Sequence, residues 1–221
     1  NLNIIDQFLM AYHSIKNNLK NYDYDISLFY NKNFKFNETD FSILKKLDIN
    51  IFEAEPDHPK VHFHCRHSAL TKKLPKNFSH RLILDTDVII LNNLKLDLTC
   101  DWQAMYASVG CYNDETNYIN KKYNFNLDFN IYEKNNVLYN TYMKDGNINK
   151  NLFPHFNGGA WLIKENLCKQ FVESYIKAYE LTFDKNHKKM NHIGIQYAQS
   201  FALIKLSKNW KPFSRGINYL L

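Results

Sequence analysis

The sequence has few of the residues that interrupt or cross-link a chain. Only 6 Gly and 5 Pro occur among its 221 residues, which argues against a flexible linker or a low-complexity region. None of the 4 cysteines belongs to a CxxC pair, so the sequence contains neither a zinc knuckle nor a dithiol redox motif. Scattered thiols suit a reducing compartment, and we expect a cytoplasmic protein.

Long apolar runs are also lacking. No stretch approaches the roughly 20 apolar residues that span a bilayer, and no signal peptide is visible. We therefore expect no membrane span in this chain, while peripheral association stays open. The chain begins with Asn1 rather than Met, so an upstream anchor stays open as well.

The composition that is present is typical of one folded domain over residues 1–221. Hydrophobic residues make up 45% of the chain, with 16 Phe and 15 Tyr, which disfavours disorder. The formal net charge of +6 favours anionic partners such as nucleotides or phosphates. The basic residues are spread out, apart from a short cluster at residues 187–189, so we do not expect a nucleic-acid partner.

Helical and extended patterns alternate along the chain. Apolar spacing predicts helices over residues 4–19, 41–47, 65–74, 165–183 and 194–206, the second capped by Thr39 or Asp40. Short buried runs predict strands over residues 25–30, 50–53, 81–91, 103–109 and 159–163. Residues 113–151 are polar and predict loops around one or two short helices. The alternation predicts an α/β domain with a mainly parallel central sheet flanked by helices.

Two carboxylates interrupt the most apolar of these strands. In RLILDTDVII, Asp85 and Asp87 lie between two buried runs, and strand ends border the ligand crevice in open α/β sheets. A bound divalent cation relieves the repulsion between neighbouring acids. Mg²⁺ and Mn²⁺ often join carboxylates to substrate phosphates. The pattern predicts a cation site at Asp85 and Asp87, although a plain turn with exposed acids would look the same.

The segment LPKNFSHRLILDTDVIILNNL resembles the DxD segment of GT-A glycosyltransferases, notably the family of glycogenin and the bacterial lipopolysaccharide galactosyltransferases. This resemblance implies a single GT-A (Rossmann-like) domain that uses Mn²⁺ or Mg²⁺. It also implies that Asp85 contacts the nucleotide-sugar and acts in catalysis, and that Asp85 and Asp87 hold the metal. The helix over residues 4–19 is similar to the one after the family's first strand, so we expect that strand to be missing or upstream.

Two further segments are similar to the same family. HFNGGAWLI resembles its FNAGVMLI element, which implies that Asn157, Gly158 and Gly159 bind the donor or acceptor. A plain turn entering a strand would also read Asn-Gly-Gly. HIGIQYAQSFAL resembles the DQxAL segment, which implies that Gln196 lies near the anomeric carbon and acts in catalysis, although Ile195 replaces the acid.

The resemblance also implies that Arg66 contacts the donor, since family members carry an arginine on the helix before the DxD strand. A guanidinium suits a phosphate or a carboxylate. No counterpart of the family's C-terminal histidine ligand is visible. The expected reaction is transfer of a sugar from a UDP-sugar to a glycan or other hydroxyl acceptor, with a tendency toward retention. The general base stays open among Asp101, Asp114 and Glu115.

Three alternatives remain. A zinc site could use His62 and His64 with Asp57 or Asp85, in a stretch that also holds His58, Cys65 and His67. A haloacid-dehalogenase-like phosphatase would use Asp85 as its nucleophile, although Ile89 stands where that family has Thr or Val. The protein could also be a catalytically inactive sugar- or nucleotide-binding relative, because Ile195 stands where the family has an acid.

Overall fold

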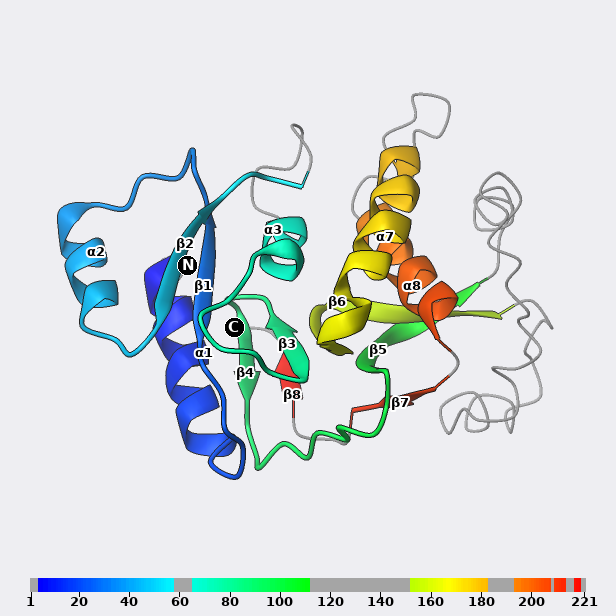
Figure 1. Cartoon of the computed structure of the whole chain (residues 1–221), viewed down its shortest axis with the longest axis horizontal. Coiled ribbons are helices and arrows are strands. Elements are labelled where there is room, and N and C mark those ends of the chain that lie inside the picture. The colour runs from blue at the N-terminus through cyan, green and yellow to red at the C-terminus, as the bar shows by residue number, and fades with distance from the viewer. Residues whose placement is uncertain are drawn as a thin grey trace.

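The computed structural model describes residues 4–57, 65–111, 152–182, 193–207, 209–213 and 217–219. The helices are α1 (Ile4–Asn18), α2 (Glu38–Lys45), α3 (Arg66–Thr71), the 3₁₀ helix η1 (Glu165–Leu167), α7 (Cys168–Thr182) and α8 (Ile193–Leu206). The strands are β1 (Ser27–Asn31), β2 (Asn50–Ala54), β3 (His80–Leu84), β4 (Val88–Ile90), β5 (Trp102–Cys111), β6 (Leu152–Lys164), β7 (Trp210–Pro212) and β8 (Ile217–Tyr219). The protein is therefore a mixed α/β structure (Figure 1).

The described strands form three small sheets rather than one large one. The largest has the order β3-β6-β5-β7, in which β6 is antiparallel to both β3 and β5, and only β7 runs parallel to its neighbour β5. A parallel pair, β1 and β2, and an antiparallel pair, β4 and β8, form the other two. The expected mainly parallel central sheet is thus not what the described residues form.

The four-stranded sheet buries side chains on both faces. Along β6, Trp161 and Ile163 pack into one cluster with α7 and α8, whereas Ala160 and Leu162 pack into a second cluster with β4. This alternation follows from the period of two residues in a strand. In Figure 1, α7 and α8 lie together over β5 and β6.

Helix α1 connects that second cluster with a third one. Its residues Ile5, Phe8 and Tyr12 pack against β1 and α2, while Leu19, which follows the helix, packs against β4. Its side chains also bind the edge of β4, since the Asn18 amide donates to the Ile90 carbonyl at 2.6 Å. The helix predicted over residues 4–19 is confirmed in this way, and it joins β1 and β2 to the rest of the described structure.

Several predicted boundaries change. Helix α2 begins at Glu38 because Asn37 is its cap, accepting from the Asp40 backbone at 2.8 Å, so the prediction of Thr39 or Asp40 is wrong. The strand predicted over residues 81–91 is two strands, β3 and β4, and β6 begins at Leu152 rather than at residue 159. Residues 113–151 lie outside the described structure.

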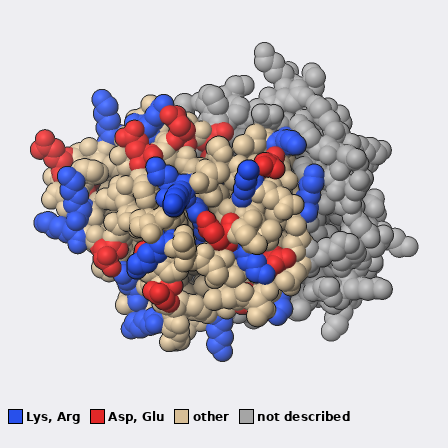
Figure 2. All heavy atoms as spheres, viewed as in Figure 1, with Lys and Arg blue, Asp and Glu red and all other residues tan. Residues whose placement is uncertain are grey.

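The surface of the described part mixes charges of both signs. Figure 2 shows Lys and Arg side chains interspersed with Asp and Glu over the visible face. Among the described helices, none is both long enough and apolar enough to cross a bilayer.

Candidate functional site

The site begins where β3 ends and the chain turns into β4. The Asp85 backbone N–H donates to the Gly159 carbonyl of β6 at 2.8 Å, and the Val88 N–H donates to the Asp85 carbonyl at 3.1 Å. The second bond closes a turn through Thr86 and Asp87, and this turn splits the predicted strand. Both acids of the DxD pattern therefore lie at the carboxyl end of β3.

Strand β6 bulges at the same level. Between the pairs Ala104–Trp161 and Tyr106–Phe156, the single residue Met105 of β5 faces residues 157–160 of β6. Bulges of this kind re-aim a strand and occur beside functional sites. Within the bulge, the Asn157 side-chain oxygen accepts from the Gly159 N–H at 2.7 Å. The Asn-Gly-Gly segment is thus the place where β6 departs from β5 and meets the end of β3.

Arg66 links these two segments from the start of α3. Its Nη2 donates to both carboxylate oxygens of Asp85 at 3.1 Å, and its Nη1 donates to Gln199 Oε1 at 3.3 Å. The arginine side chain is 7% exposed and that of Asp85 is 40% exposed. Burial alone would lower the pKa of Arg66, but the negative charge of Asp85 and other nearby groups outweighs it and raises the pKa. The guanidinium therefore remains charged inside the protein.

Gly158 leaves room for the guanidinium of Arg66, because it has no side chain. A Cβ at this position would lie 3.2 Å from Arg66 Nη2, 3.3 Å from Arg66 Nη1 and 3.3 Å from Gln199 Oε1. Such contacts are closer than a methyl group normally accepts, and the close approach of a side chain to backbone is a common reason for glycine. The second residue of Asn-Gly-Gly is thus explained by Arg66.

A third carboxylate, Asp57, lies near Arg66. Its Oδ1 accepts from the His67 backbone N–H at 2.8 Å, which orders the start of α3. Burial raises the pKa of Asp57, and the His67 N–H and the charge of Arg66 lower it in part. Asp57 Oδ2 and Arg66 Nε are buried with no hydrogen-bond partner in the described structure. Asp57 therefore orders the start of α3 and adds a second negative charge near Arg66.

Asp87 lies in an environment that disfavours its negative charge. Although the residue is exposed, the surrounding protein removes part of its water and raises the pKa of the carboxyl, and the charge of Asp85 raises it further. A positive charge placed beside both acids would oppose both effects.

The residues present fit a divalent cation that shares its ligands with a substrate. No group of three His, Cys, Asp or Glu side chains in the described ranges is arranged to enclose a metal by itself. Mg²⁺ and Mn²⁺ commonly take only one or two carboxylates and complete their shell with phosphates and water. Asp87, with Asp85 beside it, supplies that many carboxylates.

Most of the residues expected from the sequence meet here. Arg66, Asp85, Asn157 and Gly159 are joined by hydrogen bonds, Gly158 lies against Arg66, and Asp87 is two residues from Asp85. Gln196 lies in α8, but its side chain is outside the described structure. His58, His62, His64, Asp114 and Glu115 also lie outside it.

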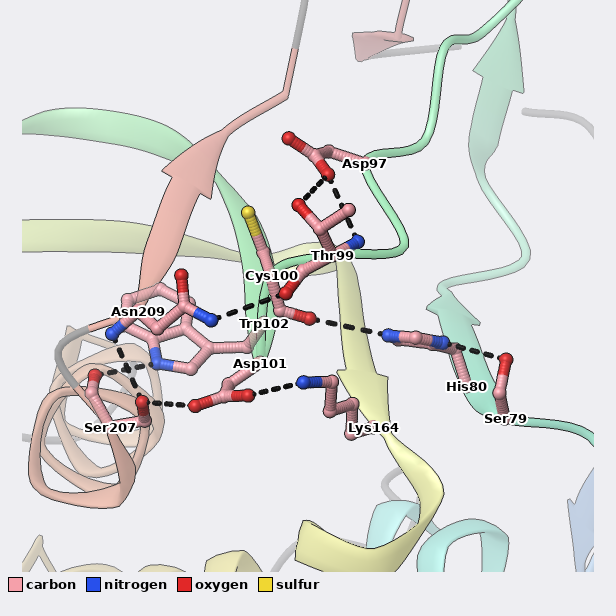
Figure 3. A network of polar contacts seen from close by, with 10 residues as sticks. All are labelled: Ser79, His80, Asp97, Thr99, Cys100, Asp101, Trp102, Lys164, Ser207 and Asn209. Atoms are coloured by element: carbon pink, nitrogen blue, oxygen red, sulfur yellow. Dashed lines mark hydrogen bonds and ion pairs between the residues drawn. The ribbon is translucent and has the colours of Figure 1, made fainter.

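Asp101 is held in a different place. It accepts from Lys164 at 2.6 Å and from the Ser207 hydroxyl, within the polar network of Figure 3. Lys164 pairs with His80, the first residue of β3, whereas Asp85 follows the last. Asp101 therefore belongs to the opposite end of the sheet, and its candidacy as a general base of this site is wrong.

Two site residues escaped the sequence analysis. Gln199 is fully buried and accepts a hydrogen bond from Arg66. Asp57 interacts with the same arginine electrostatically. The signal for Gln199 was a polar residue inside the apolar run YAQSFAL, one helical turn after Gln196. Asp57 had been considered only as a zinc ligand.

Comparison with known proteins gave no relative. No family model matches the chain, and neither a curated protein nor a solved structure is similar to it at a significant level.

Proposed function

We propose that this protein is a metal-dependent glycosyltransferase of the GT-A type, which moves a hexose from a UDP-sugar to a hydroxyl acceptor. The GT-A architecture is part of the proposal, as is the use of Mn²⁺ or Mg²⁺. One observation carries it: Arg66, Asp85 and the Asn157–Gly159 segment, each singled out by the same resemblance, lie in direct contact. These segments are far apart in sequence, so chance similarity alone gives no reason for them to meet.

The charges of the site support a cation together with a diphosphate. The guanidinium of Arg66 interacts electrostatically with three carboxylates, those of Asp57, Asp85 and Asp87. An anionic diphosphate would be repelled by such a site, and a divalent cation reverses that balance. When bound, the cation would supply charge stabilisation for the departing diphosphate.

The protein's own residues would position the donor. Arg66 orients the Asp85 carboxylate, leaving the exposed part of Asp85 to bind a hydroxyl of the donor. The bulge at residues 157–160 brings the backbone of β6 to the same place, where the Asn157 amide is close to a bound sugar. Asp87, at the exposed tip of the turn, would hold the cation together with the phosphates.

The deciding experiment is a binding titration of UDP and a panel of UDP-hexoses with and without Mn²⁺. We expect binding that depends on Mn²⁺, and we expect Asp87→Asn to weaken it about tenfold or more, which is about 1.4 kcal/mol. Asp85→Asn should weaken it at least as much, because this change also leaves Arg66 buried without its anionic partner.

Asp48→Asn is the matched control. The Asp48 side chain is 95% exposed and contacts only Lys16 at 3.5 Å among the described residues, so the same chemical change there should leave binding unaltered. Retention of full Mn²⁺-dependent binding by both Asp85→Asn and Asp87→Asn would refute the proposal. Binding without sugar transfer or hydrolysis would instead identify an inactive relative.

A further inference from the structure

We propose that Gln199 is a positioning residue of this site, which holds the Arg66 guanidinium on Asp85 and ties it to the backbone of the β6 bulge. The role in ligand binding rests on the proposed function, whereas the role in holding Arg66 does not. No resemblance assigned any role to Gln199, since the expected glutamine of this helix was Gln196.

The bulge creates the need for such a residue. Because residues 157–160 of β6 have no partner on β5, polar backbone groups at this point need other partners. Two successive residues of helix α8 bind the backbone here, one at Phe156 just before the bulge and one at Asn157 within it. The Ser200 hydroxyl accepts from the Phe156 N–H at 2.9 Å, and Gln199 Nε2 donates to the Asn157 carbonyl at 3.4 Å.

The other end of the same amide faces Arg66. Gln199 Oε1 accepts from Arg66 Nη1 at 3.3 Å, while Nη2 of that guanidinium binds Asp85. A planar guanidinium that is held through both terminal nitrogens has a fixed orientation. With Gln199 fully buried, water cannot replace it as the acceptor without entering the core.

The neutrality of the amide is as important as its geometry. A glutamine accepts a hydrogen bond from Arg66 without competing for its charge, so that charge acts chiefly on the carboxylate of Asp85. A carboxylate in the same place would divide the charge of Arg66 between two acids. Asp85 would then be less neutralised, which favours a cation and disfavours an anion.

The first test observes Arg66 directly and needs no ligand. The chain has three arginines, so side-chain NMR of ¹⁵N-arginine-labelled protein gives few signals. Arg81, held by Glu165 and two carbonyls, is an internal reference. In Gln199→Met, we expect the separate Nη signals of Arg66 to merge or shift as rotation becomes free, while those of Arg81 stay unchanged.

Gln103→Met is the matched control. Gln103 is also a buried glutamine, 2% exposed, but its Oε1 accepts from the Asp97 N–H at the other end of the sheet. The Gln103→Met variant should therefore leave the Arg66 signals unaltered. Unchanged Arg66 signals in Gln199→Met would overturn the proposal, as would an equal effect of Gln103→Met.

Gly158→Ala reaches the same contact from the opposite side, in case Gln199→Met does not fold. Its new methyl group would press on Arg66 and on Gln199 Oε1, and we expect the Arg66 signals to shift. If they do not, Arg66 is not confined as proposed.

The second test uses charge. In Gln199→Glu, we expect Mn²⁺ alone to bind about threefold tighter or more, and pyrophosphate in saturating Mn²⁺ to bind about threefold weaker or more. Opposite changes indicate a redistribution of charge at Asp85, which loss of packing does not produce. If the affinities for Mn²⁺ and for pyrophosphate both fell, Gln199 would act only through packing, and the proposal would be contradicted. If the wild type binds neither probe, the proposed function fails, and the Arg66 signals still decide the role of Gln199.

Discussion

At the residue scale, the site places two like charges, those of Asp85 and Asp87, close enough to repel each other when no ligand is bound. Asp85 is stabilised by Arg66. Asp87 forms no ion pair among the described residues, and burial and the charge of Asp85 raise its pKa although the charge of Arg66 lowers it in part. A carboxyl group whose pKa is higher in the folded state than in the unfolded state disfavours folding when it is ionised. The charge of Asp87 therefore does not stabilise the fold, which is consistent with its proposed role in holding a cation.

Replacing Asp87 should therefore stabilise the protein in metal-free buffer. At pH 7 we expect Asp87→Asn to raise the Tm by about 1–2 °C, because the variant lacks the unfavourable charge. The sign follows from the raised pKa: the wild type is penalised at high pH, and the difference disappears as the pH falls below the unfolded value of about 3.9. Thermal unfolding between pH 7 and pH 3.5 measures this.

Added Mn²⁺ should reverse the order, stabilising the wild type more than Asp87→Asn. The Mn²⁺ affinity of the wild type should begin to fall at a higher pH than for an ordinary aspartate, since protons and the cation compete for the same carboxylate. An Asp87→Asn variant that is less stable than the wild type without metal would show that the Asp87 charge is favourable in the folded protein.

At the element scale, α3 is fixed at both of its ends. Asp57 binds the N–H of His67 near its start, and Arg81 donates to the carbonyls of Ala69 and Lys72 near its end. Arg81 in turn forms a two-point ion pair with Glu165. A six-residue helix has little stability of its own, so these contacts hold the helix that carries Arg66.

Removing the donor of this ion pair should cost more than neutralising its acceptor. Arg81→Met leaves two carbonyls and Glu165 without their partner, and we expect a loss of about 3 kcal/mol in the free energy of unfolding. Glu165→Gln keeps the Arg81 bonds to the carbonyls, and since Glu165 is 42% exposed its loss should be smaller. Urea denaturation of both variants measures the difference, and the reverse order would place the main role of Arg81 elsewhere.

Local pattern was enough to predict most elements, but not how they pair. Apolar periodicity identified α1 and the positions of α7 and α8, because these signals lie within the helices themselves. The split of β3 from β4 was missed because apolar residues flank Asp85 and Asp87 on both sides. The antiparallel place of β6 was missed too: alternation with helices suggested parallel pairing, whereas pairing depends on contacts distant in sequence.

The candidate site shows the same division. Arg66, Asp85 and Gly158 were chosen from short motifs, yet their mutual contacts depend on a bulge that no motif encodes. Gln199 could not be singled out by sequence, because its contact with Arg66 depends on packing between elements that are distant in sequence.

At the scale of the whole molecule, the two ends of the four-stranded sheet have different roles, one in the proposed binding of a ligand and one in the stability of the fold. The proposed ligand site lies at the carboxyl end of β3, and the network of Figure 3 lies at its amino end. In that network, Lys164 and then Ser207 lower the pKa of Asp101, so Asp101 stabilises the fold. The two ends are about 13 Å apart, given about 3.3 Å for each residue of a strand.

Groups at that separation should act independently. We expect Asp101→Asn to lose about 1.5 kcal/mol of unfolding free energy at pH 7, and to keep Mn²⁺-dependent UDP binding. Because the pKa of Asp101 is lowered, this loss should shrink as the pH falls below about 3.9 and through the folded pKa. The double variant with Asp85→Asn should equal the sum of the single changes within about 0.5 kcal/mol. Weaker UDP binding by Asp101→Asn, or a larger departure from additivity, would mean that the sheet couples its two ends.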